Sequence, residues 1–280
     1  MQRSWRNCGG RRSFLQNESW NIYESKGELG VDGDNNIVTI FGIPFSKWGM
    51  QETVQYLTDV ISSRKPHQVI TANPIMVMAA LEDPSYKKMM QQAELIVPDG
   101  TGVVWASRVG GDPVSERVAG YELLHELMKQ GERHCWKVYL LGASPEVVQE
   151  TAKRLKIQYP GTEIVGCRDG YFSSEQDEEV VEEIRRTSPD LLFVARGADT
   201  QEPWIAKYKQ RLAVPVMMGV GGSFDVISGR TKRAPKVFQK LRLEWLYRLL
   251  REPTRFRRML ALPKFVARVL RERGNLTKSR

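Results

Sequence analysis

The segment Ile70-Thr71-Ala72-Asn73-Pro74 decides the fold class, because a strand-like apolar run ends there and a helix begins at once. Asn directly before Pro is a common helix start, since Asn caps the first turn and Pro has no amide hydrogen that would need a partner there. A strand-like run is again followed at once by the start of a helix in Leu95-Ile96-Val97-Pro98-Asp99-Gly100-Thr101-Gly102. Repeated strand-to-helix junctions of this kind predict a parallel βαβ arrangement.

The rest of the chain continues this alternation. Proline stands near the start of helical patterns at positions 74, 84 and 145, and Gly131 and Pro160 follow the ends of two others. The first strand-like run covers residues 37–41. The expected strands of the alternating pattern cover residues 68–72, 94–97, 137–141, 163–167, 191–195 and 214–218. We therefore expect an α/β fold with a Rossmann-like, doubly wound and mainly parallel sheet, whose binding residues gather at the C-terminal strand ends.

Composition divides the chain into three parts. Residues 1–35 are rich in Arg, Asn, Gly and Ser without hydrophobic periodicity, which predicts a disordered basic leader. Residues 36–229 carry the α/β pattern and form the predicted Rossmann-like domain. Residues 230–280 form a predicted arginine-rich helical appendage, with helical segments at 235–251, 253–260 and 263–273 that proline opens or separates.

The net charge of +9 is concentrated in the last of these parts. Residues 230–280 contain 17 Lys and Arg against 3 Asp and Glu, whereas the remainder contains 25 against 30. Such a tail suits an anionic partner, which is a phosphate-bearing substrate, an anionic membrane face or nucleic acid. Its aromatic and leucine residues follow amphipathic helix spacing, which together with the acidic main body argues against nucleic acid.

The cysteines and the hydropathy of the chain indicate the cellular compartment and whether a segment could span a membrane. Cys8, Cys135 and Cys167 form no Cys-x-x-Cys pair, which argues against a disulfide framework and a zinc knuckle and favours a reducing, cytosolic compartment. The long uncharged stretches 66–81 and 212–224 contain 16 and 13 residues, too few to span a bilayer.

Polar residues at two predicted strand ends form a candidate site. Thr71, Asn73 and Asp99 are expected to meet at the C-terminal edge of the sheet, where a carboxylate can accept a proton from an attacking hydroxyl. Each also has a structural interpretation. Spacing alone slightly favours Asn73 as a helix cap, and it leaves Asp99 evenly balanced between a turn or cap and a catalytic role.

A glycine-rich run follows the last predicted strand. In Gly219-Val220-Gly221-Gly222-Ser223-Phe224-Asp225, residues Gly221 and Gly222 allow the backbone to approach a phosphate or a nucleoside closely, although the pattern alone has little specificity.

These motifs together resemble the WecG/TagA/CpsF family, glycosyltransferase family 26, from about residue 37 to about residue 270. The resemblance rests on Thr71-Ala72-Asn73-Pro74, Pro98-Asp99-Gly100, Glu116-Arg117-Val118-Ala119-Gly120, Gln201-Glu202 with Trp204, the glycine-rich run, Arg233-Ala234-Pro235 and Leu243-Glu244-Trp245-Leu246-Tyr247-Arg248.

The resemblance implies an inverting, metal-independent transferase that works on the inner face of the bacterial cytoplasmic membrane. Its partners would be a UDP-sugar donor, an acceptor N-acetylglucosamine linked to undecaprenyl diphosphate, and the anionic membrane surface. The best-known members of the family transfer N-acetylmannosamine and thereby build the linkage unit of wall teichoic acid. The oligomeric state stays open, a homo-oligomer included.

The same resemblance implies roles for individual residues. Asp99 is similar in position to the general base that deprotonates the acceptor 4-hydroxyl, with Thr71 and Asn73 beside it. Arg117 and Gln201 correspond to polar contacts with sugar or phosphate. The diphosphate clamp would consist of Arg248, Arg255 and Arg258.

We expect neither a catalytic metal nor another cofactor. The Asp-x-Asp spacing that many nucleotide-sugar transferases need for a divalent ion occurs at Asp32-Gly33-Asp34, ahead of the first strand and far from the strand ends, and we interpret it as a solvated turn. The negative charge on a departing UDP would then be met by side chains and backbone amides.

One loop departs from the family pattern. The family usually reads Gly-Ala-Pro-Lys-Gln-Glu where this chain has Gly197-Ala198-Asp199-Thr200-Gln201-Glu202, and Arg196 precedes it in place of an apolar residue. A basic residue is lost and an acidic one gained, in a loop that should help to select the donor. The alternatives are therefore the same chemistry with UDP-N-acetylmannosaminuronic acid or a UDP-hexose and, from another class, a non-catalytic nucleotide-binding module with a nucleic-acid-binding tail.

Overall fold

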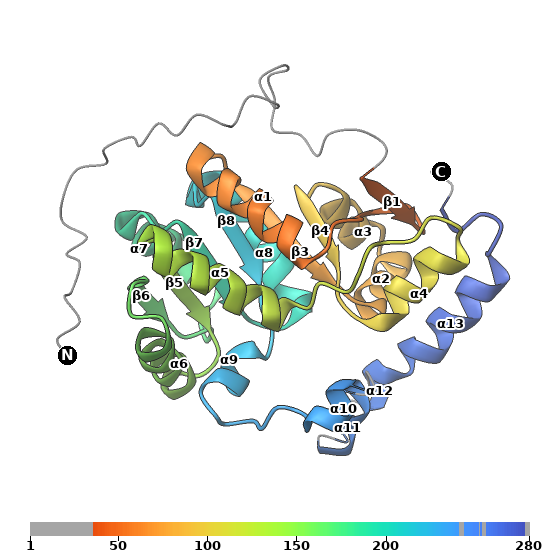
Figure 1. Ribbon diagram of the computed structural model, residues 1–280. Helices are drawn as coiled ribbons and strands as arrows, with labels where there is room; N and C mark the ends of the chain where they lie inside the picture. Colours follow the sequence, from red (N-terminus) through yellow and green to blue (C-terminus); the bar gives the residue numbers. More distant parts are fainter. Residues whose placement is uncertain (1–35, 241–243, 252, 254–255, 278–280) are drawn as a thin grey trace.

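The computed structural model describes residues 36–277 except 241–243, 252 and 254–255 (Figure 1). The predicted leader 1–35, with its Asp32-Gly33-Asp34 turn, and the predicted clamp residue Arg255 lie outside the described residues.

Six parallel strands form the main sheet, in the order β4-β3-β8-β7-β5-β6. The strands are β3 (His67–Ala72), β4 (Leu95–Pro98), β5 (Lys137–Gly142), β6 (Glu163–Arg168), β7 (Leu191–Ala195) and β8 (Val216–Gly219). Each of the six predicted strands is present, with ends displaced by at most two residues. The predicted α/β fold with a parallel, Rossmann-like sheet is therefore confirmed.

A separate hairpin precedes this sheet. Strands β1 (Ile37–Ile40) and β2 (Ile43–Ser46) pair antiparallel. Phe41 and Gly42 form the turn between them with φ angles of 53° and 80°, the left-handed conformation that two-residue hairpin turns require. The sequence indicated β1 but not β2, because Pro44 and the shortness of the run obscure the strand pattern.

Helices cover both faces of the sheet (Figure 1). One face is packed by α1 (Met50–Ser63), α5 (Gly120–His134), α6 (Pro145–Gln158) and α9 (Ser223–Ile227). The other is packed by α2 (Pro74–Glu82), α3 (Pro84–Gln91), α4 (Thr101–Val109), α7 (Asp177–Thr187) and α8 (Ala198–Leu212), with the short 3-10 turn η1 (Ser174–Gln176) before α7.

Strand residues alternate between these two layers. Leu140 of β5 lies in the first core and Leu141 in the second, and both are fully buried. Parallel strands that are buried on both faces read as continuous apolar runs, which is why the strand positions were visible in the sequence.

The C-terminal residues form α10 (Lys236–Lys240), α11 (Glu244–Arg251), α12 (Phe256–Met259) and α13 (Ala261–Arg271). Helix α13 begins before Pro263, which occupies the first turn, where its missing amide hydrogen leaves no bond unmade. Phe265 and Val269 of α13 are buried in the core beside α2 and α4. The Phe265 ring packs edge-on against the Phe41 ring, with the ring centroids 6.1 Å apart. The last helix thus contributes to the core of the main body.

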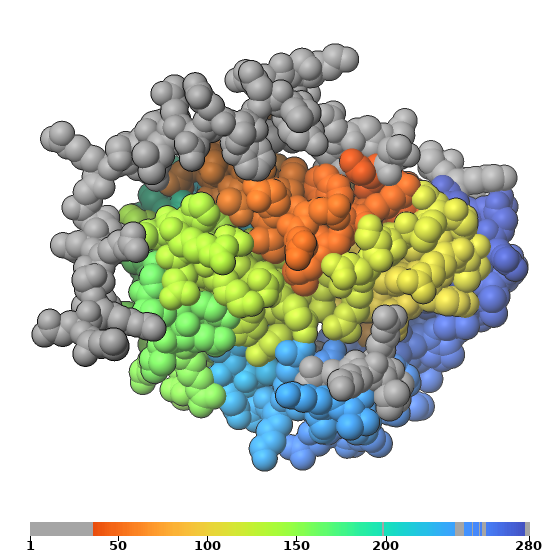
Figure 2. All heavy atoms as spheres, in the orientation of Figure 1, coloured from red at the N-terminus to blue at the C-terminus, as the bar shows by residue number. Residues whose placement is uncertain are grey.

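The C-terminal segment lies against the α4 and α5 region. In Figure 2 its blue residues follow the lower and right-hand margins, next to the yellow and yellow-green residues of α4 and of the segment that leads into α5. Among the helices that the structure describes, none is long and apolar enough to cross a bilayer.

Candidate functional site

Strands β3 and β4 end side by side and bring three of the predicted site residues together. Ala72 is paired with Pro98 across the two strands, and the Asp99 amide donates a hydrogen bond to the Ala72 carbonyl at 2.9 Å. Asn73 lies next to Gly100, since a Cβ built on Gly100 would be 3.8 Å from that of Asn73. Thr71, Asn73 and Asp99 therefore converge at the C-terminal edge of the sheet.

Gly120, at the first position of α5, connects two of these side chains. Its amide donates a hydrogen bond to Asp99 Oδ2 at 3.3 Å. The Thr71 hydroxyl lies so close that a Cβ added to Gly120 would be 2.8 Å from it. The loop before α5 is held in place by a bond from the Val118 amide to the Pro98 carbonyl at 3.0 Å. Gly120 belongs to one of the motifs that carry the family resemblance, but the sequence alone assigns it no role; its position at the start of a helix is the available signal.

The interpretation of Asn73 as a helix cap is confirmed. Its Oδ1 accepts hydrogen bonds from the amides of Ile75 at 2.9 Å and Met76 at 3.2 Å, at the start of α2. A contact with a ligand would therefore use the Nδ2 amino group, and that role stays a prediction.

Arg117 lies within a charged network at the start of α5. Its guanidinium is 3.5 Å from Glu244 of α11 and 3.9 Å from Glu122 of α5. Arg233 pairs with the same two carboxylates and stacks over the Tyr121 ring at 4.4 Å. The network joins the C-terminal segment to the strand-end region beside Asp99. Sequence reasoning named Arg117 but not these carboxylate partners, which lie up to 127 residues away.

The glycine turn, residues 219–222, begins at the last residue of β8 and is bonded to the start of α8. The Gly221 amide donates a hydrogen bond to Gln201 Oε1 at 3.1 Å, so two predicted site segments are joined. The Gln201 side-chain amino group in turn donates to Glu202 Oε1 at 3.1 Å. Gln201 is 5% exposed and Glu202 is 1% exposed, so this pair supports the turn from inside the protein.

The predicted diphosphate clamp is described in part. Arg258 of α12 donates a hydrogen bond to Asp199 of α8 at 3.0 Å. The backbone of Arg248 lies in α11, but its side chain, like the whole of Arg255, is outside the described residues. Arg196, at the end of β7, places its guanidinium over the Phe172 ring at 4.2 Å.

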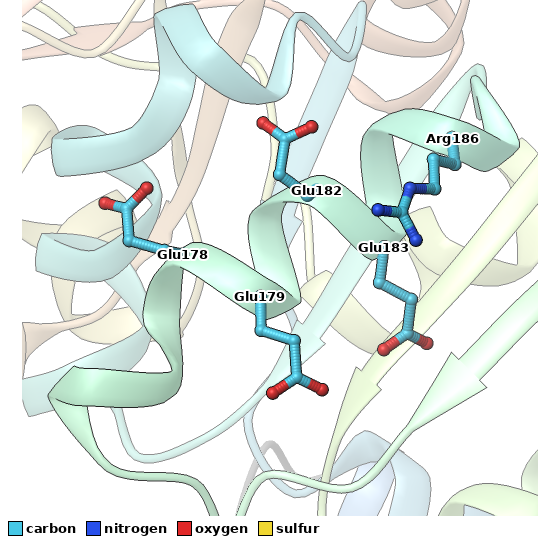
Figure 3. A pocket seen from close by; sticks show the side chains of 5 residues that line it. All are labelled: Glu178, Glu179, Glu182, Glu183 and Arg186. Atoms are coloured by element: carbon cyan, nitrogen blue, oxygen red, sulfur yellow. The ribbon is translucent and has the colours of Figure 1, made fainter.

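Acidic side chains of α7 surround a hollow. It is lined by Glu178, Glu179, Glu182, Glu183 and Arg186 (Figure 3). The two pairs of side chains, 178 with 182 and 179 with 183, point to different sides of the helix (Figure 3). Arg168 forms ion pairs with the carboxylates at 179 and 183, and Arg211 forms ion pairs with those at 178 and 182. The described part of the chain contains no group of three or more His, Cys, Asp or Glu side chains placed to hold a metal ion.

Comparisons with known proteins show the family to which the chain is similar. Residues 38–279 match the family described as the glycosyl transferase WecG/TagA/CpsF family. A protein of Bacillus spizizenii is 42% identical over 76% of this chain and 82% of its own length. Proteins of Bacillus subtilis and Staphylococcus aureus are 37% and 36% identical over 85% and 87% of this chain, and over 92% and 96% of their own lengths. All three are named N-acetylglucosaminyldiphosphoundecaprenol N-acetyl-beta-D-mannosaminyltransferase.

Proposed function

Because the chain belongs to the WecG/TagA/CpsF family of glycosyl transferases, we propose that it transfers N-acetylmannosamine from its UDP form to N-acetylglucosamine on undecaprenyl diphosphate. The product would carry a β-1,4 linkage and serve as the linkage unit of wall teichoic acid. The observation that carries this proposal is the shared name of three relatives whose similarity extends over most of both chains.

Asp99 is the proposed general base. The acceptor 4-hydroxyl attacks the anomeric carbon from the face opposite UDP, so a new carbon–oxygen bond forms while the bond to UDP breaks and the configuration inverts. The hydroxyl proton passes to the Asp99 carboxylate. The bond from the Gly120 amide to Oδ2 supports this role, because it holds the carboxylate in one orientation at the strand edge.

The departing UDP carries negative charge that cationic side chains and amides would stabilise. Arg117 and Arg258 are proposed contributors, together with Arg248, Arg255 and the backbone amide of Gly222, since the Gly221 amide already donates to Gln201. The place of Arg117 supports this role, because it directly precedes Val118, whose amide is bonded to the Pro98 carbonyl; Arg258 is supported by its contact with the first turn of α8. The proposed reaction therefore requires no metal ion.

The C-terminal helices are the proposed contact with the anionic inner face of the bacterial cytoplasmic membrane. Among their exposed apolar side chains are Leu250, Phe256, Leu260, Val266 and Leu270, and we propose that these form one apolar strip. Exposed basic residues accompany the strip, among them Arg251, Arg257, Lys264, Arg268 and Arg271. Apolar side chains that enter the lipid boundary, with cations at the anionic surface, are the usual means of peripheral attachment.

The test is a direct transfer assay. The purified protein is incubated with a short-chain lipid diphosphate carrying N-acetylglucosamine and, separately, with UDP-N-acetylmannosamine, UDP-N-acetylglucosamine, UDP-N-acetylmannosaminuronic acid and UDP-glucose. We expect one N-acetylhexosamine to be added, as measured by mass, and only from UDP-N-acetylmannosamine. Transfer from the uronic acid or the hexose donor in its place would contradict the proposed donor but leave the reaction class intact.

A further inference from the structure

Glu202 is a buried carboxylate that the proposed chemistry does not use. It lies in α8 and is 1% exposed. Its Oε1 accepts a hydrogen bond from Gln201 Nε2, and its Oε2 accepts one from Gln68 Nε2, each at 3.1 Å. Gln68 Nε2 also donates to the Glu202 backbone carbonyl at 3.0 Å. Both carboxylate oxygens are therefore acceptors for side-chain amides from two different elements, α8 and β3.

This arrangement determines which way the Gln201 amide points. A primary amide has a donor side and an acceptor side. Since Nε2 of Gln201 is bound to the carboxylate, its Oε1 is directed the other way, where it accepts the hydrogen bond from Gly221. Glu202 thus acts on the glycine turn through Gln201.

The start of the glycine turn is shaped around the same pair. A Cβ built on Gly219 would lie 2.1 Å from Glu202 Oε1 and 2.4 Å from Gln201 Nε2, so no side chain fits there. At the other end of the turn the surroundings are open, because a Cβ on Gly221 would meet nothing within 4 Å. The turn is consequently fixed from the inside and accessible from the outside, as a backbone site for a phosphate requires.

Building on the proposed function, we propose that Glu202 is a positioning residue, whose carboxylate orients Gln201 so that the glycine turn is preorganised for the nucleoside diphosphate of the donor. In the proposed arrangement Glu202 touches no substrate. Its contribution is the conformation of the turn, and preorganisation of this kind acts on donor affinity.

A carboxylate is required at this position because both neighbours are donors. The Gln of Glu202→Gln has one acceptor oxygen, so Gln68 and Gln201 cannot both keep their present orientations. If Gln201 rotates, its amino group faces the Gly221 amide and the bond to the turn is lost.

The experiment measures UDP affinity by calorimetry and, separately, donor KM and kcat, all at about pH 8, where the Glu202 carboxylate is ionised. We expect Glu202→Gln to raise the UDP Kd and the donor KM about tenfold, as the loss of one buried hydrogen bond predicts, with kcat changed less than about threefold. Gln201→Ala should have a similar effect, and combining it with Glu202→Gln should add little, since both remove the same bond.

Asp177→Asn is the matched control. Asp177 is also a buried carboxylate, 6% exposed, and accepts hydrogen bonds from two donors of α8, Trp204 Nε1 at 2.8 Å and Tyr208 at 2.9 Å. Its substitution should lower the melting temperature without changing UDP affinity.

An unchanged UDP Kd in Glu202→Gln would overturn the proposal, as would effects of Glu202→Gln and Gln201→Ala that multiply. Because UDP binding is measured without turnover, these outcomes are distinct from a failure of the wild-type protein to transfer N-acetylmannosamine, which would contradict the proposed function instead.

Discussion

Arg258 and Asp199 form a hydrogen-bonded ion pair across 3.0 Å and thereby connect α12 to the first turn of α8. Asp199 stands in the loop that departs from the family pattern, directly before the Gln201-Glu202 pair that supports the glycine turn. The two side chains are 61% and 72% exposed, so the pair contributes little to stability. The ion pair matters for donor binding, because Arg258 is a proposed ligand of the donor diphosphate.

Asp199→Asn should strengthen donor binding. The substitution removes a carboxylate that competes with the diphosphate for Arg258, and we expect the donor KM to fall by about twofold to fivefold, which corresponds to the energy of an exposed ion pair. Asp112→Asn, which removes a second exposed partner of an ion pair, with Lys47, serves as the control and should leave KM unchanged. A higher KM in Asp199→Asn would show that Asp199 itself binds the donor.

Asp99→Asn should abolish turnover while UDP affinity stays nearly intact. Asn retains an acceptor for the Gly120 amide but cannot take the acceptor's proton, and general-base catalysis typically contributes about 10²-fold to 10⁴-fold in rate. Single-turnover measurements with the lipid acceptor, and calorimetry with UDP, separate the two effects. Asp83→Asn, at an exposed capping carboxylate, is the control. Near-normal turnover in Asp99→Asn would remove Asp99 from the role of base.

Gly120→Ala should impair catalysis by displacing Thr71. The added Cβ would lie 2.8 Å from the Thr71 hydroxyl, which must shift together with the loop that holds Asp99. We expect kcat to fall by about tenfold or more, since misplacement of about 1 Å has such consequences. Gly274→Ala is a suitable control, because a Cβ there meets nothing within 4 Å. If the kcat of Gly120→Ala equals that of the wild type, the close approach of Thr71 has no catalytic importance.

The stability of the protein should depend on the ionisation of Glu202. Burial raises the pKa of Glu202 from 4.5 to about 7, although hydrogen bonds from Gln68 and Gln201 lower it. Tyr86 of α3 stays neutral over this range, since burial, Glu202 and Asp199 all raise the pKa of Tyr86. The folded chain therefore binds more protons than the unfolded chain between these two values of pH.

The contribution of Glu202 to the free energy of unfolding is fully present below about pH 4.5 and is lost as the pH rises through about 7, an effect of about 3 kcal/mol. Urea unfolding of the wild type and of Glu202→Gln across this range should show a difference that changes with pH in this direction. A difference that is constant with pH would contradict the raised pKa.

Membrane attachment should depend on the exposed apolar strip of the C-terminal helices. Replacing Phe256 and Leu260 together by Ser is expected to reduce sedimentation with anionic vesicles by about tenfold or more, since each large apolar side chain contributes about 1.5–3 kcal/mol when buried. Ile157→Ser on α6, where the side chain is 80% exposed, is the control. Unchanged sedimentation of the double variant would exclude this surface. Surface substitutions are preferable to truncation before residue 235, because truncation would also remove Phe265 and Val269 from the core.

The strand positions and the placement of Thr71, Asn73 and Asp99 were predictable because they depend on local patterns. Apolar runs mark strands that are buried on both faces, and parallel strands must end at the same edge of the sheet. The cap at Asn73 was predictable for the same reason. The hairpin strand β2 was missed because four residues with an internal Pro carry too little periodicity. Direct contact of Gln201 with sugar or phosphate, and the clamp at Arg248 and Arg255, stay predictions.

The sequence by itself determined the fold class, the edge of the sheet that bears the site and, through its motifs, the family. Tertiary structure decided which residues act on one another. Gly120 reaches Asp99 and Thr71, Arg117 meets Glu244 across 127 positions, and Gln68 meets Glu202 across 134. A hydrogen bond or ion pair between distant residues leaves no periodic trace along the chain, because its geometry exists only after the strands and helices have packed.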